Sequence, residues 1–248
     1  DGSIKKHESN SKQAFTGLAN NYEQARPDYP RSLYKTLIDF WKLGAETKAH
    51  HPVIVDVGCG TGISSRAIHQ EFDGNCTVYG IEPGDEMRER AKKSTKEKIT
   101  YMNASAEAMP FEDSSVDIVT AAQAAQWFNR PLFYKEVNRV LKPNGVVAIY
   151  ENNRDWERSD FLERHEKILE AYATKKDGTK YSRYYREFPY DNELRNAFGN
   201  SVTHSFNWNR EMKSAEFLIM AKSSTQVKRA IENVGKEKVE SEIMQNNR

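Results

Sequence analysis

The feature that most limits what this chain can fold into is a short apolar strand that runs directly into a glycine-rich turn. Val53 to Val57 is a β-branched run with the length of a buried strand, and Gly58-Cys59-Gly60-Thr61-Gly62 follows it. Glycine permits positive φ and lets a ligand approach the backbone closely. Residues from Ile63 to Phe72 then read as a helix. The segment therefore predicts a strand, a tight loop and a helix, with a ligand-binding site at the loop.

The same alternation of strand and helix continues to residue 150. The predicted strands after the first are Thr77–Ile81, Ile99–Tyr101, Val116–Ala122 and Val146–Tyr150, and the predicted helices are Glu86–Ser94 and Pro131–Leu141, with a turn at Lys142–Gly145 before the last strand. Strands that alternate with helices at this spacing form right-handed βαβ units. We therefore expect an α/β fold: a Rossmann-like, doubly wound and mostly parallel sheet with helices on both faces.

We expect one domain over residues 1–248. Residues 12–44 should form N-terminal cap helices, with helical spacing at Lys12–Asn21 and again around Leu33–Leu43, and residues 50–152 the core. Residues 153–200 are rich in charged and aromatic side chains and should form a lid or insertion that selects the ligand. Residues 201–248 should supply an edge strand and helices. The helical signals in these last two regions are Phe161–Tyr172, Asn192–Phe198, Ala215–Ala221 and Gln226–Val239, and the strand signal is Val202–Trp208.

Composition excludes several classes of protein. Lys and Arg number 37 against 36 Asp and Glu, which gives a net charge of +1 and disfavours a general nucleic-acid binder. No apolar run approaches the roughly 18 residues of a membrane span. The two cysteines, Cys59 and Cys76, are too few for a disulfide framework, and the histidines show no metal-ligand spacing. We expect a cytoplasmic protein without a bound metal, either a monomer or a homodimer.

The spacing of the loop and two acidic residues narrow the ligand. The glycines follow G-x-G-x-G, whereas a dinucleotide pyrophosphate loop follows G-x-G-x-x-G. Asp56 lies just inside the loop, where it would repel a pyrophosphate but pair with an ammonium group. Glu82 ends the second strand, where a carboxylate accepts hydrogen bonds from ribose hydroxyls. The pattern favours an adenosine-type ligand over a nicotinamide dinucleotide; the alternative is that the glycines serve packing only.

These residues resemble the class I S-adenosylmethionine-dependent methyltransferases, and within them the small-molecule branch that includes trans-aconitate methyltransferases. The resemblance covers about residues 14–150 well and the rest loosely. It is carried by Tyr22–Pro30, Val55–Gly62, Gly80–Pro83, Ser105–Phe111, Gln123–Phe128 and Val140–Gly145. The implied cofactor is S-adenosyl-L-methionine, with S-adenosyl-L-homocysteine as product.

The resemblance also implies a role for individual residues. Those that would hold the cofactor are Asp56, Gly58, Cys59, Gly60 and Gly62 around the methionine part, Glu82 at the ribose, Pro83 and Met87 beside the adenine, Ser105 and Ala106 at the adenine edge, Gln123 beneath the cofactor, and Tyr22 and Arg26 over the methionine carboxylate. Many relatives have Asp at the position of Ser105. For Arg26 a surface salt bridge is an equally good interpretation.

Gln126 and Trp127 would position the methyl acceptor. Many relatives carry His at the position of Gln126, and glutamine can orient an acceptor but cannot remove its proton at neutral pH. Methyl transfer manages without a base when the acceptor is already anionic, because the sulfonium is the electrophile and the protein aligns the reacting atoms. We therefore favour transfer to an oxygen such as a carboxylate of a small, anionic molecule. The alternative is that these side chains only pack.

Three questions stay open at this point: the role of residues 154–200, the function, and the edge of the sheet. Lys175, Lys176, Lys180, Arg183 and Arg186 lie among the aromatic residues of 154–200, and this region is either a pocket for an anionic acceptor or a solvated insertion. A methyltransferase acting on RNA or protein, and a non-catalytic cofactor-binding protein, are the alternative functions. The resemblance implies a sheet of the seven-stranded type, because relatives end in an antiparallel hairpin that supplies strands six and seven at the sheet edge, yet Lys236–Arg248 is polar. The sheet therefore lacks its final edge strand if the chain stops before it, or its edge is built differently; an exposed edge needs a cover such as a second subunit.

Overall fold

The computed structural model describes residues 29–44, 51–185 and 187–245, and it divides them into two compact units. Unit 1 contains residues 29–44, 51–151 and 189–208, and unit 2 contains residues 152–185, 187–188 and 209–245. The predicted segment 153–200 is thus divided between the units at residue 189. The predicted helix at Lys12–Asn21 lies outside the described residues.

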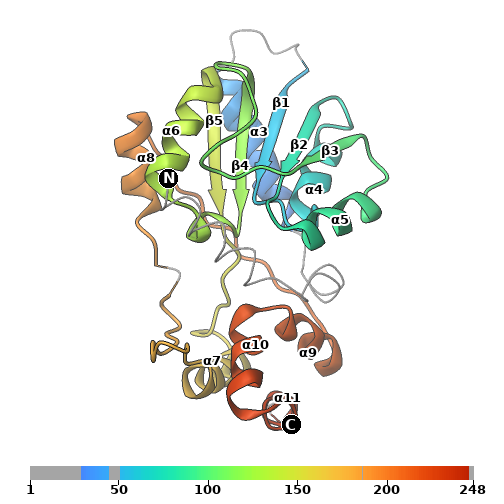
Figure 1. Ribbon diagram of the computed structural model, residues 1–248, viewed down its shortest axis with the longest axis vertical. Helices are drawn as coiled ribbons and strands as arrows, with labels where there is room; N and C mark the ends of the chain where they lie inside the picture. Colours follow the sequence, from blue (N-terminus) through green and yellow to red (C-terminus); the bar gives the residue numbers. More distant parts are fainter. Residues whose placement is uncertain (1–28, 45–50, 186, 246–248) are drawn as a thin grey trace. The chain divides into compact units, whose positions relative to one another are not determined.

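Unit 1 is built on a five-stranded sheet in the order β3-β2-β1-β4-β5, with every neighbouring pair parallel (Figure 1). Its strands are β1 (Val53–Val57), β2 (Thr77–Ile81), β3 (Ile99–Met102), β4 (Val116–Ala122) and β5 (Leu141–Tyr150). The strand order reverses direction between β1 and β4, which makes the sheet doubly wound and creates a switch point at their carboxyl ends. The predicted α/β, doubly wound and parallel fold is confirmed, and the described residues form five strands of the seven-stranded type of sheet that was expected.

Helices cover both faces of this sheet. They are α3 (Arg31–Gly44), α4 (Ile63–Glu71), α5 (Asp85–Ser94), α6 (Arg130–Val140) and α8 (Tyr190–Phe198), and a short 3₁₀ turn, η1 (Ala125–Trp127), follows β4. On one face, Tyr34 and Trp41 of α3 and Ile68 of α4 are buried together against Ile54 of β1. Another cluster joins α6 and α8 to Val55, Val57, Val119 and Ala121. Alternate residues of β1 thus enter different clusters, as period-two alternation requires.

The turn predicted at Lys142–Gly145 became an irregularity inside β5. Val116 pairs with Leu141 and Ile118 pairs with Val146, so the intervening stretch of β5 is longer than the stretch of β4 opposite it. Asn144 has φ 66°, in the left-handed region that turn residues favour. The chain therefore bulges at the predicted turn and re-enters the sheet at Val146.

The strand predicted at Val202–Trp208 is absent: residues 200–213 form neither helix nor strand. The alternation of apolar residues is present in the sequence, but a strand also needs a backbone partner. Among the described strands β5 is an edge that pairs only with β4, and Val202 is 53% exposed. Local alternation without a partner gives no sheet.

Unit 2 is helical within the part of the chain that the structure describes. Its helices are α7 (Asp160–Tyr172), α9 (Ser214–Lys222), α10 (Thr225–Val234) and α11 (Lys236–Gln245). Leu169, Phe217, Val227 and Val239 are among the side chains of its core. The single helix predicted over Gln226–Val239 is two helices, because Gly235 at φ 91° turns the chain between α10 and α11.

Candidate functional site

The predicted glycine loop lies between β1 and α4, at the carboxyl end of the sheet. Gly58, Gly60 and Gly62 have φ values of 66°, 55° and 82°, a region that side chains with a Cβ rarely adopt. A Cβ on Gly58 would lie 2.7 Å from the Cβ of Ala124, in the segment after β4. Position 58 therefore requires glycine for two reasons: its φ is positive, and a Cβ would collide with Ala124.

Asp56 is fully buried beneath this loop. Its Oδ2 accepts a hydrogen bond from the Ser65 hydroxyl at 2.6 Å, and its Oδ1 accepts one from the Thr120 hydroxyl at 2.9 Å. Burial raises the pKa of the Asp56 carboxyl to about 6, although both hydroxyls oppose the shift. The carboxylate thus links β1, α4 and β4. Its contact with a ligand ammonium stays a prediction.

Glu82 joins the two loops that follow β1 and β2. Its Oε2 accepts the Gly60 N–H at 3.0 Å, and its Oε1 accepts the Gly84 N–H at 2.7 Å. Both carboxylate oxygens are thus held by backbone amides, which fixes the side chain where the loops after β1 and β2 adjoin. Pro83 follows directly, and Met87 in the first turn of α5 is buried.

The segment after β3 brings a buried hydroxyl to the same end of the sheet. The N–H of Glu82 donates to the carbonyl of Met102 at 3.1 Å, which ties the ends of β2 and β3 together. Ser105 and Ala106 come next and are both buried, and the Ser105 Oγ has no hydrogen-bond partner among the described residues. A buried hydroxyl without a partner costs free energy, which a ligand that bonds it would recover.

The segment after β4 contributes Gln123, Gln126 and Trp127. Gln123 has φ 49° and donates its N–H to the carbonyl of Tyr150 at the end of β5. Gln126 and Trp127 belong to η1, and the Gln126 Nε2 donates to the Gln123 carbonyl at 3.1 Å. A non-glycine residue with positive φ is typical of a constrained functional loop.

The structure therefore brings most of the predicted site residues to adjoining strand ends. Tyr22 and Arg26 are predictions outside the described residues. Cys59 is buried over Gly80 and Tyr101, and burial raises the pKa of its thiol. It is thus not suited to act as a nucleophile.

Sequence reasoning missed the partners of Asp56. Thr120 pairs with Asp56 in the β1–β4 register, and Ser65 lies in the first turn of α4. A hydroxyl on a central strand was the available signal, but only the order of the strands identifies Thr120 as a neighbour. The predicted cation Arg183 is not a free charge, because its Nε and Nη2 each donate to Glu170 at 2.8 Å. Arg186 lies outside the described residues.

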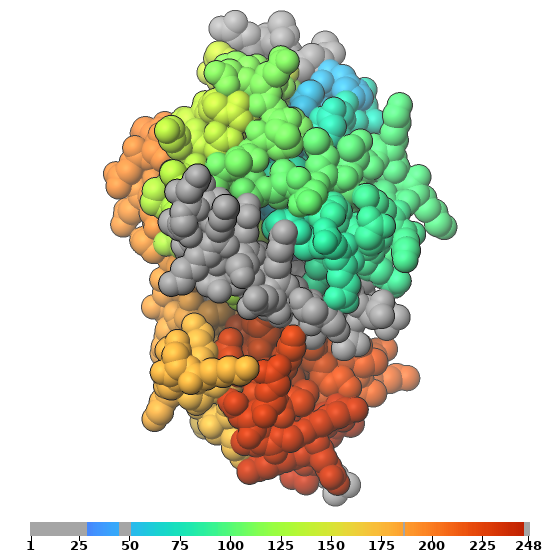
Figure 2. All heavy atoms as spheres, in the orientation of Figure 1, coloured from blue at the N-terminus to red at the C-terminus, as the bar shows by residue number. Residues whose placement is uncertain are grey.

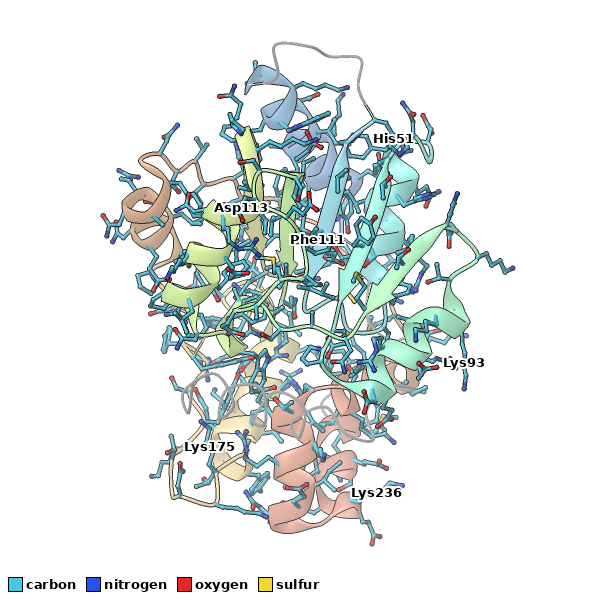
Figure 3. The ribbon with its side chains drawn as sticks, turned by 45° about the horizontal axis from the view of Figure 1, so that its top comes forward. His51, Lys93, Phe111, Asp113, Lys175 and Lys236 are labelled. Carbon is cyan, nitrogen blue, oxygen red and sulfur yellow. The ribbon has the colours of Figure 1, made fainter. Side chains whose placement is uncertain are left out.

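Two further features of unit 1 are its surface over β2 to β4 and the side chain of His51. Figure 2 shows the atoms from β2 to β4 as one continuous surface on the face in view. His51, labelled in Figure 3, precedes β1, and its ring contacts the Asn75 and Thr77 side chains at 3.2 and 2.9 Å. This histidine is thus at the amino end of the sheet, away from the glycine loop. No described helix is long and apolar enough to cross a membrane.

The strand order and the glycine loop define a Rossmann-like domain, and solved structures share this fold. A structure from Anaeromyxobacter dehalogenans that carries a type II methyltransferase assignment has a TM-score of 0.62, with 22% identity over 89% of each chain. A methyltransferase assigned to antibiotic biosynthesis in Anabaena variabilis has a TM-score of 0.62, with 18% identity over 90% of this chain and 85% of the other. At these identities the likeness concerns the fold.

Sequence comparison finds similarity to methyltransferases in the core of the chain. Residues 55–149 match the family model described as a methyltransferase domain. A Schizosaccharomyces pombe protein named as an uncharacterized methyltransferase-like protein is 34% identical over 152 residues, which cover 61% of this chain and 56% of the relative. A Saccharomyces cerevisiae protein assigned as an S-adenosylmethionine-dependent methyltransferase is 32% identical over 136 residues. These residues cover 52% of this chain and 44% of the relative.

Residues 55–149 thus match a methyltransferase domain, relatives named as methyltransferases are similar to about half of the chain, and solved structures share its fold. The chain spans about half the length of the curated relatives it matches. The narrower resemblance to trans-aconitate methyltransferases stays a prediction.

Proposed function

We propose that this chain transfers the methyl group of S-adenosylmethionine to an oxygen, such as a carboxylate oxygen, of a small-molecule acceptor. The observation that carries the proposal is the contact between Glu82 and the glycine loop. The Glu82 carboxylate at the end of β2 accepts the Gly60 N–H at 3.0 Å and the Gly84 N–H at 2.7 Å, and these bonds hold it at the carboxyl end of the sheet. This arrangement suits an adenosine ribose at the switch point of a doubly wound sheet.

The residues present fit such a cofactor. Glu82 would accept the ribose hydroxyls, and the buried Ser105 Oγ has a hydrogen-bonding capacity that an adenine edge would use. The backbone of Gly58 and Gly60 would meet the methionine part, where the absence of a Cβ permits close approach. When bound, the sulfonium supplies an activated methyl group.

The chain's own residues would then align the acceptor. Gln126 and Trp127 come directly after β4, and Gln126 is anchored to the Gln123 carbonyl. Bound S-adenosylmethionine would supply the methyl group for an in-line displacement by the acceptor oxygen, with the electron pair of the broken carbon–sulfur bond left on sulfur. A carboxylate oxygen carries no proton, so an amide at position 126 is sufficient and a base is not required there.

Calorimetric titration with S-adenosylhomocysteine tests the cofactor site. Glu82→Gln keeps the shape of the side chain but removes a charged acceptor, and we expect the Kd to rise about 10-fold or more. Glu89→Gln is the matched control, because Glu89 is exposed on α5 and forms an ion pair with the exposed Lys92. Micromolar binding by the parent protein and by Glu89→Gln supports the proposal. No binding by the parent protein refutes it.

A further inference from the structure

The side-chain amide of Gln126 has a fixed orientation. Its Nε2 donates to the Gln123 carbonyl at 3.1 Å. Exchange of the amide nitrogen and oxygen would place two acceptor oxygens against each other, so this contact decides which atom is which. The other end of the amide, Oε1, is therefore a hydrogen-bond acceptor that points away from the Gln123 carbonyl.

The Oε1 of Gln126 is buried and accepts no hydrogen bond from the described residues. A buried carbonyl oxygen without a donor costs about 1–3 kcal/mol, and native proteins rarely keep one without a reason. The anchor of the amide is itself strained, because Gln123 has φ 49° and is held by the Tyr150 carbonyl. Two costly features in one short loop indicate that Oε1 is placed for a ligand.

The missing partner must be a hydrogen-bond donor. A carboxylate offers only lone pairs, which would face the lone pairs of Oε1, whereas a hydroxyl or an N–H group satisfies it. The same amide cannot remove a proton, so it does not activate the hydroxyl for transfer. The donor is thus a group that recognises Gln126 and is distinct from the oxygen that reacts.

We propose that the methyl acceptor is a carboxylic acid that also carries a hydroxyl or amide N–H group, and that this group donates to the Gln126 Oε1. The proposal rests on the proposed function, because it takes the reacting oxygen to be a carboxylate. It narrows the acceptor class from simple carboxylates to hydroxy acids and N-acyl amino acids.

The test uses matched pairs of acids and S-adenosylmethionine with a deuterated methyl group. Each pair holds a 2-hydroxy acid or an N-acetyl amino acid and the acid of the same carbon skeleton without the hydroxyl or amide. Ester formation is measured by mass spectrometry, and kcat/KM is compared within each pair. We expect the donor-bearing acid to be preferred by at least 10-fold, since a site built to bond a hydroxyl rejects the analogue without it.

Gln126→Met keeps the length of the side chain and removes the acceptor oxygen, and Gln126→Leu is a second variant should methionine disturb the loop. Both should reduce the preference within each pair to less than 3-fold, with the Kd for S-adenosylhomocysteine within 2-fold of the parent protein as evidence of an intact fold. Gln70→Leu, at an exposed position of α4, is the control and should keep the preference.

Three results would overturn the inference while the proposed function survives. They are equal use of both acids in a pair, a preference that persists in both Gln126 variants, and a loss of S-adenosylhomocysteine affinity in those variants, which would make the cofactor the donor. If S-adenosylhomocysteine binds but no acid of any pair is esterified, the proposed carboxylate chemistry fails, and this inference fails with it.

Discussion

Asp56→Asn should make this protein more stable at neutral pH. The Asp56 carboxyl is fully buried, and burial raises its pKa from 3.8 to about 6. A shift of about two pKa units corresponds to about 3 kcal/mol. The ionised carboxylate lowers the free energy of unfolding by this amount at neutral pH. An asparagine has nearly the same shape, and its amide can bond the Ser65 and Thr120 hydroxyls without a charge.

The sign of the pH dependence follows from the direction of the shift. The folded protein holds the Asp56 proton up to about pH 6, whereas the unfolded chain releases it near pH 3.8. The contribution of this group to stability is therefore full below pH 4 and is lost as the pH rises from 4 to 6. The stability gain of Asp56→Asn over the parent protein should be small at pH 4.5 and reach about 3 kcal/mol at pH 7.5.

The assay is urea unfolding of the parent protein and Asp56→Asn at several pH values, with hydrogen exchange of the β1 and β4 amides to isolate unit 1. The difference between the proteins is the useful quantity, because other titrating groups cancel in it. A variant that is no more stable at pH 7.5, or whose gain does not change between pH 4.5 and 7.5, would refute the reasoning.

Asp117→Asn is the matched control on β4. Asp117 is also buried, but its Oδ2 accepts the Val53 N–H and pairs with Lys142, each at 2.8 Å. Loss of this charge breaks a favourable pair, so the control should lose about 1 kcal/mol or more at pH 7.5. The same substitution is thus expected to have opposite effects at two buried carboxylates. If Asp56 also meets the cofactor ammonium, Asp56→Asn will bind S-adenosylmethionine more weakly despite its greater stability.

Three further substitutions probe the site and unit 2. Gly58→Ala should unfold at lower urea and bind S-adenosylhomocysteine at least 10-fold more weakly, because the new Cβ meets Ala124; Gly178→Ala, which has φ 85° and open space, should cost less. Ser105→Ala should weaken S-adenosylhomocysteine binding about 3- to 10-fold in calorimetry without loss of stability, since its buried hydroxyl has no partner in the described chain; a lower unfolding midpoint would show that the hydroxyl is structural. Glu166→Gln should lower the stability of unit 2 by about 3 kcal/mol, because Glu166 is buried and pairs with Arg154 at 2.5 Å; unchanged hydrogen exchange in α7 would contradict this.

The strands of the core were predictable because each carries its signal locally. The predicted bounds of β1, β2 and β4 match the structure residue for residue, since short runs rich in β-branched residues favour a buried strand. The glycine loop was predictable for the same reason, because three glycines at alternate positions after a strand indicate a tight turn with positive φ. The failed strand at Val202–Trp208 had the same kind of local signal, yet its existence depended on a partner elsewhere in the chain.

The candidate site also has features that the sequence predicted and contacts that it did not. The sequence indicated that Asp56 and Glu82 lie at strand ends, and the parallel order of the sheet then implied that they share one edge. It did not indicate that the hydroxyls of Ser65 and Thr120 hold both oxygens of Asp56, or that Glu82 bonds the glycine loop. Those contacts join residues 9 to 64 positions apart.

The sequence by itself determined the alternation of strands and helices, the glycine loop and the acidic residues beside it, because periodicity and glycine conformation are properties of short segments. Only the tertiary structure decided the protonation behaviour of Asp56, the burial of the Gln126 Oε1 and the fate of residues 200–213. Each of these depends on burial or on a hydrogen-bond partner that is remote in the chain, and such partners exist only once the sheet has formed.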